Sequence, residues 1–193
     1  MLNYHATPGL GMNHPFYSPW YEWPLIRRPM YYAAAQYMPA GYSCAIFCFG
    51  NPAVWIPGLA GVLGTLLIWL HGHRYRSEAL PGLWHMRSLP DSTAAVFILI
   101  GLLAQFLPWT LVPRGTYIYH YFATVPFLCL GTALTLHQLT KLRPKAGRRV
   151  TAVYLLICLA FFIAFYPYAS GVTVPVVWLD LITDLRLLVL YHA

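Results

Sequence analysis

The chain has 193 residues, of which 59% are hydrophobic and only 9% are charged, and its formal net charge is +7. Soluble domains carry about a quarter charged residues, so this composition excludes an ordinary water-soluble fold and predicts an integral membrane protein. In such a protein the excess positive charge indicates topology and attraction to anionic lipid headgroups, and no nucleic-acid partner is expected.

Residues 1–51 contain no long uninterrupted apolar run. Prolines at positions 8, 15, 19, 24 and 29 interrupt any long helix, and the segment between them is rich in aromatic side chains. Two interpretations are open. The segment is an aromatic belt at the headgroups, or it is a surface that stacks on a sugar or peptide, with Trp20, Tyr21 and Trp23 as the acceptor or sugar contacts.

Four apolar runs follow, each long enough to cross ~30 Å of hydrocarbon as a helix. The first begins at Asn51-Pro52, which is an N-cap residue followed by a proline at the first helical position, and ends near residue 70. The others cover roughly residues 94–111, 121–140 and 150–166. The last of these is expected to stop at Tyr166, before Pro167.

The tail has apolar residues at helical spacing from residue 175 to residue 193, interrupted by Asp180, Asp184 and Arg186. This pattern predicts a helix that lies at the membrane interface. The predicted fold is therefore all-α and integral to the membrane. It has an aromatic and proline-rich segment at 1–51, a four-helix transmembrane region at 52–168, and a tail with an interfacial helix at 169–193.

Orientation follows from the basic residues. Eight of the twelve Lys and Arg lie in the two predicted loops at 71–92 and 141–149. The positive-inside rule places these loops in the cytoplasm. Both termini and residues 1–51 then lie on the extracytoplasmic side of the cell membrane. Met1 is followed by no signal-peptide pattern, so we expect upstream helices of a longer polytopic protein to carry residues 1–51 across.

The polar turn between the second and third runs is the leading candidate site. It carries Arg114, Tyr119 and His120 at the predicted membrane surface. An arginine there can hold a lipid phosphate in bidentate fashion, with tyrosine and histidine as further donors. The alternative is that these side chains are ordinary interfacial anchors. No metal or other cofactor is predicted, because the pair His71 and His73 has no third ligand nearby.

Several stretches resemble the protein O-mannosyltransferases, in the bacterial branch that lacks a β-trefoil domain. They are residues 14–29 (HPFYSPWYEWPLIRRP), 50–55 (GNPAVW), 114–127 (RGTYIYHYFATVPF) and 166–175 (YPYASGVTVP). The resemblance implies the glycosyltransferase C fold and a reaction that moves mannose, or another hexose, from a polyprenyl-phosphate carrier to Ser/Thr hydroxyls of proteins. It covers the family's C-terminal four-span region.

That reaction needs a carboxylate to take the acceptor's proton and a cationic cradle for the leaving phosphate. In the family the catalytic acidic residue lies in the first external loop, N-terminal to everything in this chain. The resemblance therefore implies a chain that is inactive alone and whose partners are membrane lipids, the donor, the protein acceptor and the missing N-terminal half. Arg114, Tyr119 and His120 then belong to the phosphate side.

Glu22 is the one carboxylate in residues 1–51. It is a candidate replacement base, and the alternative is a solvated glutamate or one paired with Arg27 or Arg28. At the level of the whole chain, the competing hypothesis is a non-catalytic membrane subunit that binds the lipid carrier or completes a split enzyme. The sequence does not indicate whether a divalent ion takes part.

Overall fold

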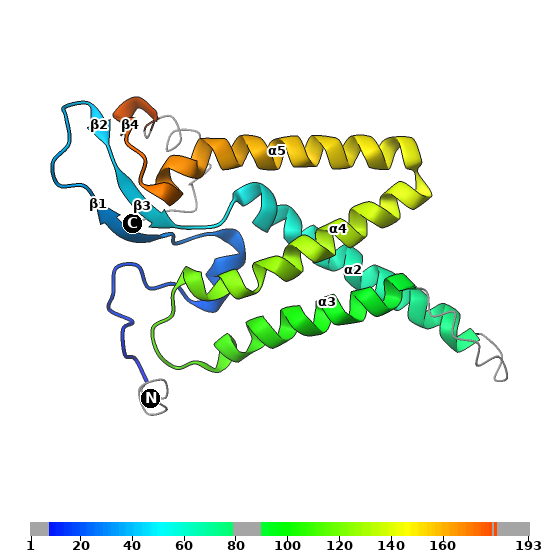
Figure 1. Ribbon diagram of the computed structural model, residues 1–193. Helices are drawn as coiled ribbons and strands as arrows, with labels where there is room; N and C mark the ends of the chain where they lie inside the picture. The colour runs from blue at the N-terminus through cyan, green and yellow to red at the C-terminus, as the bar shows by residue number, and fades with distance from the viewer. Residues whose placement is uncertain (1–7, 79–89, 179, 181–193) are drawn as a thin grey trace.

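The computed structural model describes residues 8–78, 90–178 and 180. For residues 73–78, 90 and 91 it describes the backbone only. Four long helices form a bundle, with a small N-terminal unit packed at one end of it (Figure 1). The helices are α2 (Pro52–Glu78), α3 (Pro90–Phe106), α4 (Val125–Leu142) and α5 (Pro144–Ser170). The central helix is α4, which packs against the other three.

Helix α2 begins where the sequence predicts. The Asn51 side-chain oxygen accepts a hydrogen bond from the backbone N–H of Ala53 at 2.9 Å, so Asn51 acts as the N-cap. The Asn51 amide also donates to the backbone carbonyl of Cys158 in α5 at 3.0 Å. One residue therefore caps α2 and fixes it to α5.

Three helical segments are long and apolar enough to cross a membrane: Pro52–Gly72, Ser92–Leu111 and Pro144–Ser170. The second comprises α3 and the short 3-10 helix η2 (Leu107–Leu111) that follows it. The 18-residue α4 is not among them. It carries polar side chains such as Thr132, Thr135 and Gln138, which lower its hydropathy. The structure thus confirms a mostly helical fold, with helices long and apolar enough to cross a membrane at three of the four predicted positions.

The contact between α2 and α4 explains the polarity of α4. Gly58, Gly61 and Gly64 of α2 lie directly against Leu128, Thr132 and Thr135 of α4, with no room for a further methyl group. The Thr135 hydroxyl donates to the backbone carbonyl of Gly61 at 3.0 Å. The Thr65 hydroxyl lies 3.3 Å from the backbone carbonyl oxygen of Gly131. Small residues and threonine hydroxyls at such a contact are typical of helix packing in membranes.

The N-terminal unit departs from the all-α expectation, because it contains two small antiparallel sheets. Strand β1 (Met30–Ala34) pairs with β3 (Ala45–Cys48) in a register that brings Met30 opposite Cys48. Strand β2 (Tyr42–Ser43) pairs with β4 (Val174–Pro175), which lies beyond the end of α5. The second sheet joins segments far apart in the sequence, so no local pattern predicts it.

Two boundaries near α5 also differ from the prediction. The basic segment expected to be a loop is mostly helical, because Pro144 occupies the first position of α5 and the helix includes Arg148. The other end of α5 passes through Pro167 to Ser170 and closes on Gly171, whose φ is 70° and whose N–H donates to the Pro167 carbonyl at 2.9 Å. A proline therefore does not end the helix.

The predicted interfacial helix falls mostly outside the described residues. Residues 176–178 and 180 are helical, and the Trp178 indole donates to the backbone carbonyl of Ala164 in α5 at 3.2 Å. Asp184 and Arg186 lie outside the described part of the chain.

The main hydrophobic core lies where the N-terminal unit meets the bundle. Its largest fully buried side chains are Trp23 of the 3-10 helix η1 (Trp20–Leu25), Trp55 of α2, Ile118 of the 3-10 helix η3 (Ile118–Ala123) and Leu128 of α4. Because four separate elements contribute to it, this core fixes η1 and η3 against the ends of the helices.

Candidate functional site

The segment that carries Arg114 is held by the N-terminal segment through backbone hydrogen bonds. The Gly9 N–H donates to the Pro113 carbonyl at 3.0 Å and the Gly115 N–H donates to the Leu10 carbonyl at 2.6 Å. Gly115 is buried against the backbone of Gly11, where a Cβ has no room. The half-buried Arg114 donates from Nη1 to the Gly115 carbonyl at 3.2 Å. Its charge is therefore carried by a loop of defined position.

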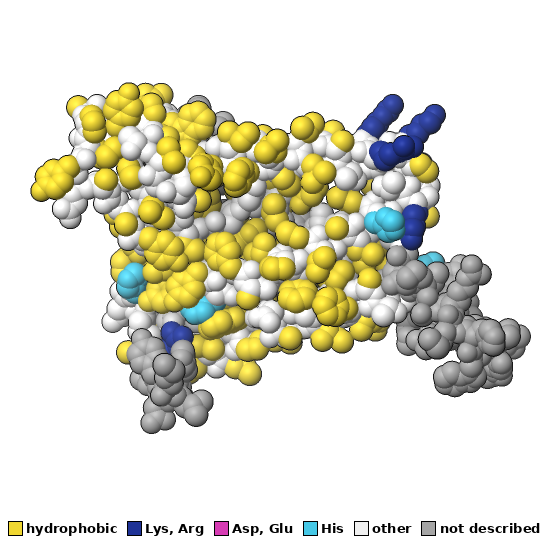
Figure 2. All heavy atoms as spheres, in the orientation of Figure 1, with side chains coloured by type: hydrophobic (Ala, Val, Ile, Leu, Met, Phe, Trp, Pro, Cys, Tyr) yellow, Lys and Arg dark blue, Asp and Glu magenta, His cyan; other side chains and the backbone are white. Residues whose placement is uncertain are grey.

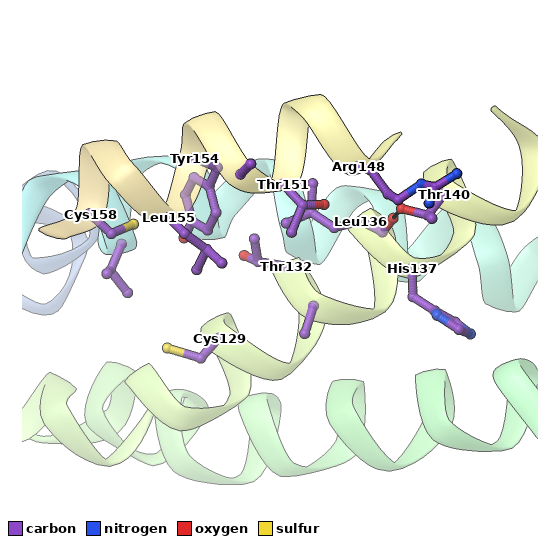
Figure 3. A pocket seen from close by; sticks show the side chains of 13 residues that line it. Cys129, Thr132, Leu136, His137, Thr140, Arg148, Thr151, Tyr154, Leu155 and Cys158 are labelled. Atoms are coloured by element: carbon purple, nitrogen blue, oxygen red, sulfur yellow. Dashed lines mark hydrogen bonds between the residues drawn. The ribbon is translucent and has the colours of Figure 1, made fainter. Parts of the chain in front are cut away.

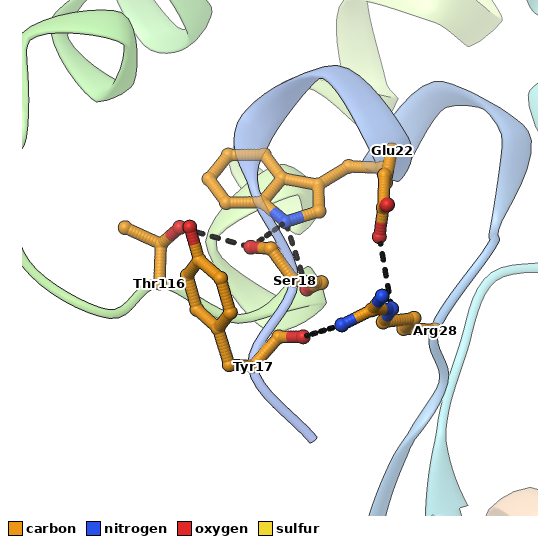
Figure 4. Close-up of polar contacts among 6 residues, drawn as sticks. Tyr17, Ser18, Glu22, Arg28 and Thr116 are labelled. Atoms are coloured by element: carbon orange, nitrogen blue, oxygen red, sulfur yellow. Dashed lines mark hydrogen bonds and ion pairs between the residues drawn. The ribbon is translucent and has the colours of Figure 1, made fainter. Parts of the chain in front are cut away.

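A buried polar network secures the same junction (Figure 4). The Ser18 N–H donates to the Thr116 carbonyl at 3.0 Å, and the Thr116 hydroxyl donates to the Ser18 carbonyl at 2.9 Å. The Trp23 indole N–H lies 3.0 Å from both the carbonyl and the hydroxyl oxygen of Ser18. Buried polar groups satisfied in this way specify one arrangement of the segments that they join.

His120 lies in η3, among aromatic rings. Its ring centroid is 4.0 Å from that of Trp109 and 4.2 Å from that of Tyr119, and it stacks on Trp23 at 5.9 Å. Its Nδ1 lies 3.2 Å from the Tyr117 nitrogen and 2.9 Å from the Tyr117 carbonyl oxygen. The tautomer of the ring decides which of these two backbone groups Nδ1 bonds, and either contact holds the imidazole at the start of η3.

The structure thus brings Tyr119 and His120 into contact and places Arg114 at the start of the same segment. Tyr119 is partly exposed, and its ring also stacks on Tyr117 at 5.7 Å. The arginine is cationic at every physiological pH, and the phenol and the imidazole are each able to donate a hydrogen bond. Chemically, such a group can bind a phosphate and stabilise negative charge that develops on it.

The three aromatic residues expected to contact an acceptor or sugar have different environments. Tyr21 is 61% exposed, and its ring meets that of Trp20 edge to face at 5.6 Å. Trp20 is partly buried against Phe106. Trp23 has no exposed surface. In this arrangement Tyr21 and Trp20 can contact a ligand, whereas Trp23 packs in the core and positions η1.

Glu22 is paired with Arg28, as the structural alternative expects. Its Oε2 atom is buried and lies 3.3 Å from Arg28 Nε, and the Glu22 side chain is 12% exposed. Arg28 also donates from Nη1 to the Tyr17 carbonyl at 3.1 Å. The ion pair joins η1 to the segment after it, and the hydrogen bond from Arg28 to Tyr17 joins that segment to the one before η1, so the visible role of Glu22 is structural (Figure 4).

Two phenols of the N-terminal unit have raised pKa values. Burial, followed by a hydrogen bond with Cys48, raises the pKa of Tyr32 to about 12, although 52% of the side chain is exposed and solvent screens part of this effect. Burial, followed by Tyr21 and Glu22, also raises the pKa of Tyr17. Both side chains are therefore protonated near neutral pH and remain hydrogen-bond donors.

Within the described residues, no three His, Cys, Asp or Glu side chains gather as a metal site would require. The four cysteines, Cys44, Cys48, Cys129 and Cys158, are free thiols.

Sequence reasoning missed the residues that hold the site in place. Ser18 and Thr116 are small polar residues in segments without periodicity, and Trp109 follows Pro108 at the end of an apolar run. The role of Ser18 and Thr116 in fixing the site becomes visible only when residues 9–18 are seen to lie beside residues 113–116. The signal available in the sequence was the dense aromatic composition of both segments, which indicates a shared core without saying which rings meet.

Comparisons with known proteins give the chain its family. The model of the family described as "C-terminal four TMM region of protein-O-mannosyltransferase" matches residues 1–188. The polyprenol-phosphate-mannose–protein mannosyltransferase of Mycobacterium tuberculosis is 29% identical over 191 residues, which cover 90% of this chain and 32% of the relative. That of Mycolicibacterium smegmatis is 27% identical over 190 residues, covering 88% and 32%. The chain therefore spans about a third of the length of these relatives.

A solved structure shares the fold. The Saccharomyces cerevisiae protein O-mannosyltransferase Pmt1-Pmt2 complex bound to the sugar donor matches 82% of this chain and 21% of the matched chain, with a TM-score of 0.63 and 21% sequence identity. The sequence match extends over nearly the whole chain, and this fold agrees with it. The chain belongs to the protein O-mannosyltransferase family, in the part that forms its C-terminal four-span region.

Proposed function

We propose that this chain is the C-terminal membrane part of an enzyme that transfers mannose from a polyprenyl-phosphate carrier to Ser/Thr hydroxyls of proteins, and that it binds the carrier phosphate. The observation that carries the proposal is the loop of Arg114, fixed between residues 9–18 and η3 by the hydrogen bonds of Gly9, Gly115 and Thr116. The named activity of the mycobacterial relatives supports the substrate class.

In this proposal Arg114 pairs with the phosphate, and Tyr119 and His120 add hydrogen bonds. A rigid arginine fork suits a phosphate because it donates two parallel hydrogen bonds in a set geometry. As the bond from mannose to phosphate breaks, negative charge grows on the phosphate, and a cation already in place lowers the barrier. No cofactor is assigned to this chain.

We assign the removal of the acceptor's proton to a carboxylate outside this chain. Glu22 is held by Arg28, and a base must approach the hydroxyl that it deprotonates. The relatives are about three times as long, which leaves a large part of the enzyme to supply that base. Tyr21 and Trp20 are the aromatic surface that we assign to the acceptor or sugar.

We also propose that α4 completes a set of four spans. Thr132 and Thr135 of α4 pack against Gly61 and Gly64 of α2, and most of the remaining side chains of α4 are apolar, so the helix can lie in a bilayer as part of the bundle. The basic end at the α4–α5 turn is then cytoplasmic. The N-terminal unit, Arg114 and both termini are extracytoplasmic.

The test is transfer of labelled mannose from polyprenyl-phosphate-mannose to Ser/Thr peptides, in membranes that contain this chain alone or with an upstream half taken from a mycobacterial relative. We expect no transfer by the chain alone and transfer when the halves are combined. Transfer by the chain alone would contradict the assignment of the base, and Glu22→Gln would then show whether Glu22 supplies it.

The competing hypothesis, a non-catalytic carrier-binding subunit, has a different outcome in this assay. If this chain only completes a split enzyme, the reconstituted halves would transfer mannose equally well when Arg114 is replaced by alanine. If it only binds the carrier, Arg114→Ala would raise KM for the donor and leave kcat unchanged, whereas the proposed role at the leaving phosphate predicts that kcat falls as well.

A further inference from the structure

A groove runs between α4 and α5 at some distance from the Arg114 loop (Figure 3). Its volume is about 740 Å³, and the residues that line it come chiefly from the facing sides of these two helices. Cys129 and Cys158 lie toward one end, whereas His137, Thr140 and Arg148 lie toward the other.

The wall of the groove is largely apolar, and the hydroxyls of its three threonines bond within their own helices. The Thr132 hydroxyl donates to the Leu128 carbonyl, that of Thr140 to Leu136, and that of Thr151 to Gly147, all at 2.8–2.9 Å within their own helices. Because these donors are already satisfied within their own helices, the three threonines impose no requirement for a polar ligand. Leu136 and Leu155 complete a surface suited to hydrocarbon.

The mouth of the groove is strongly cationic. Arg148 lines it, and its Nε donates to the Pro144 carbonyl at 3.2 Å, which orients the guanidinium at the start of α5. Four more exposed cations surround the same turn: Lys141, Arg143, Lys145 and Arg149. Figure 2 shows Lys and Arg gathered at this end of the molecule. Of the carboxylates whose side chains the structure describes, Glu22 belongs to η1 and Asp180 to the tail, at the opposite end of α5. Two more acidic residues, Glu78 at the end of α2 and Asp91 near the start of α3, lie at the basic end of the bundle (Figure 1).

The length of the groove points to one kind of occupant. From Arg148 to Cys158 is ten residues of α5, or about 15 Å at 1.5 Å per residue. A membrane-spanning helix needs an apolar surface of ~30 Å, whereas a single leaflet contributes about half of that thickness. A groove of one leaflet's depth, apolar along its length and cationic at its mouth, matches an acyl chain with an anionic headgroup.

We propose that the α4–α5 groove binds one anionic phospholipid from the leaflet that the basic turn faces. The lipid phosphate pairs with Arg148 and its neighbouring cations, and one acyl chain lies along Leu136 and Leu155 toward Cys158. This site is separate from the proposed carrier site, because Arg114 precedes η3 at the other end of α4.

The test uses the purified chain in detergent, with phosphatidylglycerol and phosphatidylcholine of identical acyl chains as probes. Native mass spectrometry measures how much lipid stays bound, and thermal unfolding measures the shift in Tm that each lipid causes. We expect one phosphatidylglycerol to be retained and to raise Tm, with phosphatidylcholine retained at least fivefold less, as expected for about 1 kcal/mol per basic residue near the headgroup.

Two pairs of variants locate the lipid. In the first pair, Ala152→Trp fills the groove, whereas Ala160→Trp places the same ring on an exposed face of α5. In the second pair, Arg148→Gln removes the charge at the mouth of the groove, whereas Arg27→Gln removes an exposed charge in the N-terminal unit. We expect the first member of each pair to lose phosphatidylglycerol at least fivefold and the second to retain it. If Ala152→Trp fails to fold, Arg148→Gln decides.

Equal retention of the two lipids, or unchanged retention in Arg148→Gln, would overturn the proposal. Polyprenyl phosphate displacing phosphatidylglycerol at equal concentration would overturn it in favour of a second carrier site. Loss of the lipid when the upstream half is co-expressed would show instead that a protein helix fills the groove. None of these outcomes depends on transferase activity, so the result is independent of the proposed function.

Discussion

At the residue scale, the structure separates side chains that can meet a substrate from those that hold them in place. Arg114, Tyr119 and His120 lie in one short segment, with partly exposed side chains. Trp23, Ser18 and Thr116 lie behind them, fully or almost fully buried. The first group is suited to binding, and the second restricts the first to one arrangement.

Replacing Arg114 tests the phosphate site directly. In the reconstituted enzyme we expect Arg114→Ala to raise KM for the polyprenyl-phosphate donor about 10- to 100-fold, since hydrogen bonds to charged groups contribute about 1.5–3 kcal/mol. Arg114→Lys should fall in between, because lysine keeps the charge and loses the bidentate fork. KM for the acceptor peptide should not change.

Arg27→Ala is the matched control, because Arg27 is an exposed cation of the same N-terminal unit. Intact folding of each variant is checked by thermal unfolding in detergent. An Arg114→Ala enzyme that folds and keeps its donor affinity would remove Arg114 from the phosphate site.

At the element scale, the bundle depends on how closely α2 approaches α4. Gly61 has the Thr132 backbone and hydroxyl against it, and its carbonyl accepts hydrogen bonds from both Thr65 and Thr135. In a membrane, packing and hydrogen bonds of this kind replace the hydrophobic effect as the force between helices. The glycine face of α2 is thus a structural element rather than a binding one.

We therefore expect Gly61→Leu to separate α2 from α4 and to lower the stability of the purified chain by about 1–3 kcal/mol or more, the usual cost of overpacking. Ala60→Leu adds a side chain of the same size on the neighbouring, exposed face of α2 and should leave stability nearly unchanged. Thermal unfolding in detergent, followed by tryptophan fluorescence, compares the two. Equal Tm values for both variants would contradict this account of the α2–α4 contact.

At the scale of the whole molecule, the bundle has two chemically different ends. One end carries the aromatic N-terminal unit, the Arg114 loop and the small β2–β4 sheet, while the other carries the basic α4–α5 turn (Figures 1 and 2). The long sides between them are covered by hydrophobic side chains. A molecule with this distribution fits a bilayer with its helices across it.

The proposed orientation is testable by cysteine labelling in intact cells, after the four native cysteines are replaced by serine. Tyr37→Cys, at a site that is 93% exposed in the N-terminal unit, should react with a membrane-impermeant maleimide. Lys145→Cys, at the basic turn, should react only after the membrane is permeabilised. The reverse pattern would invert the topology, and reaction of both in intact cells would mean that α2, α3 and α4 do not all cross the membrane.

The sequence by itself determined the membrane class, three of the predicted spans, the Asn51 cap and the family. These features depend on composition, on local hydropathy and on short motifs, all of which act between residues that are close in the chain. The resemblance of residues 14–29 and 114–127 to the family also indicated where its characteristic segments lie, although not how they meet.

Only the tertiary structure decided which side chains come together. The pairing of Ser18 with Thr116 and of β2 with β4 joins segments separated by most of the chain, and the burial of Trp23 follows from that docking. The polarity of α4 likewise becomes intelligible only once Thr135 is seen against Gly61. The physical reason is that hydropathy describes how each segment alone interacts with solvent. These roles depend instead on packing and hydrogen bonds between segments that are distant in the sequence.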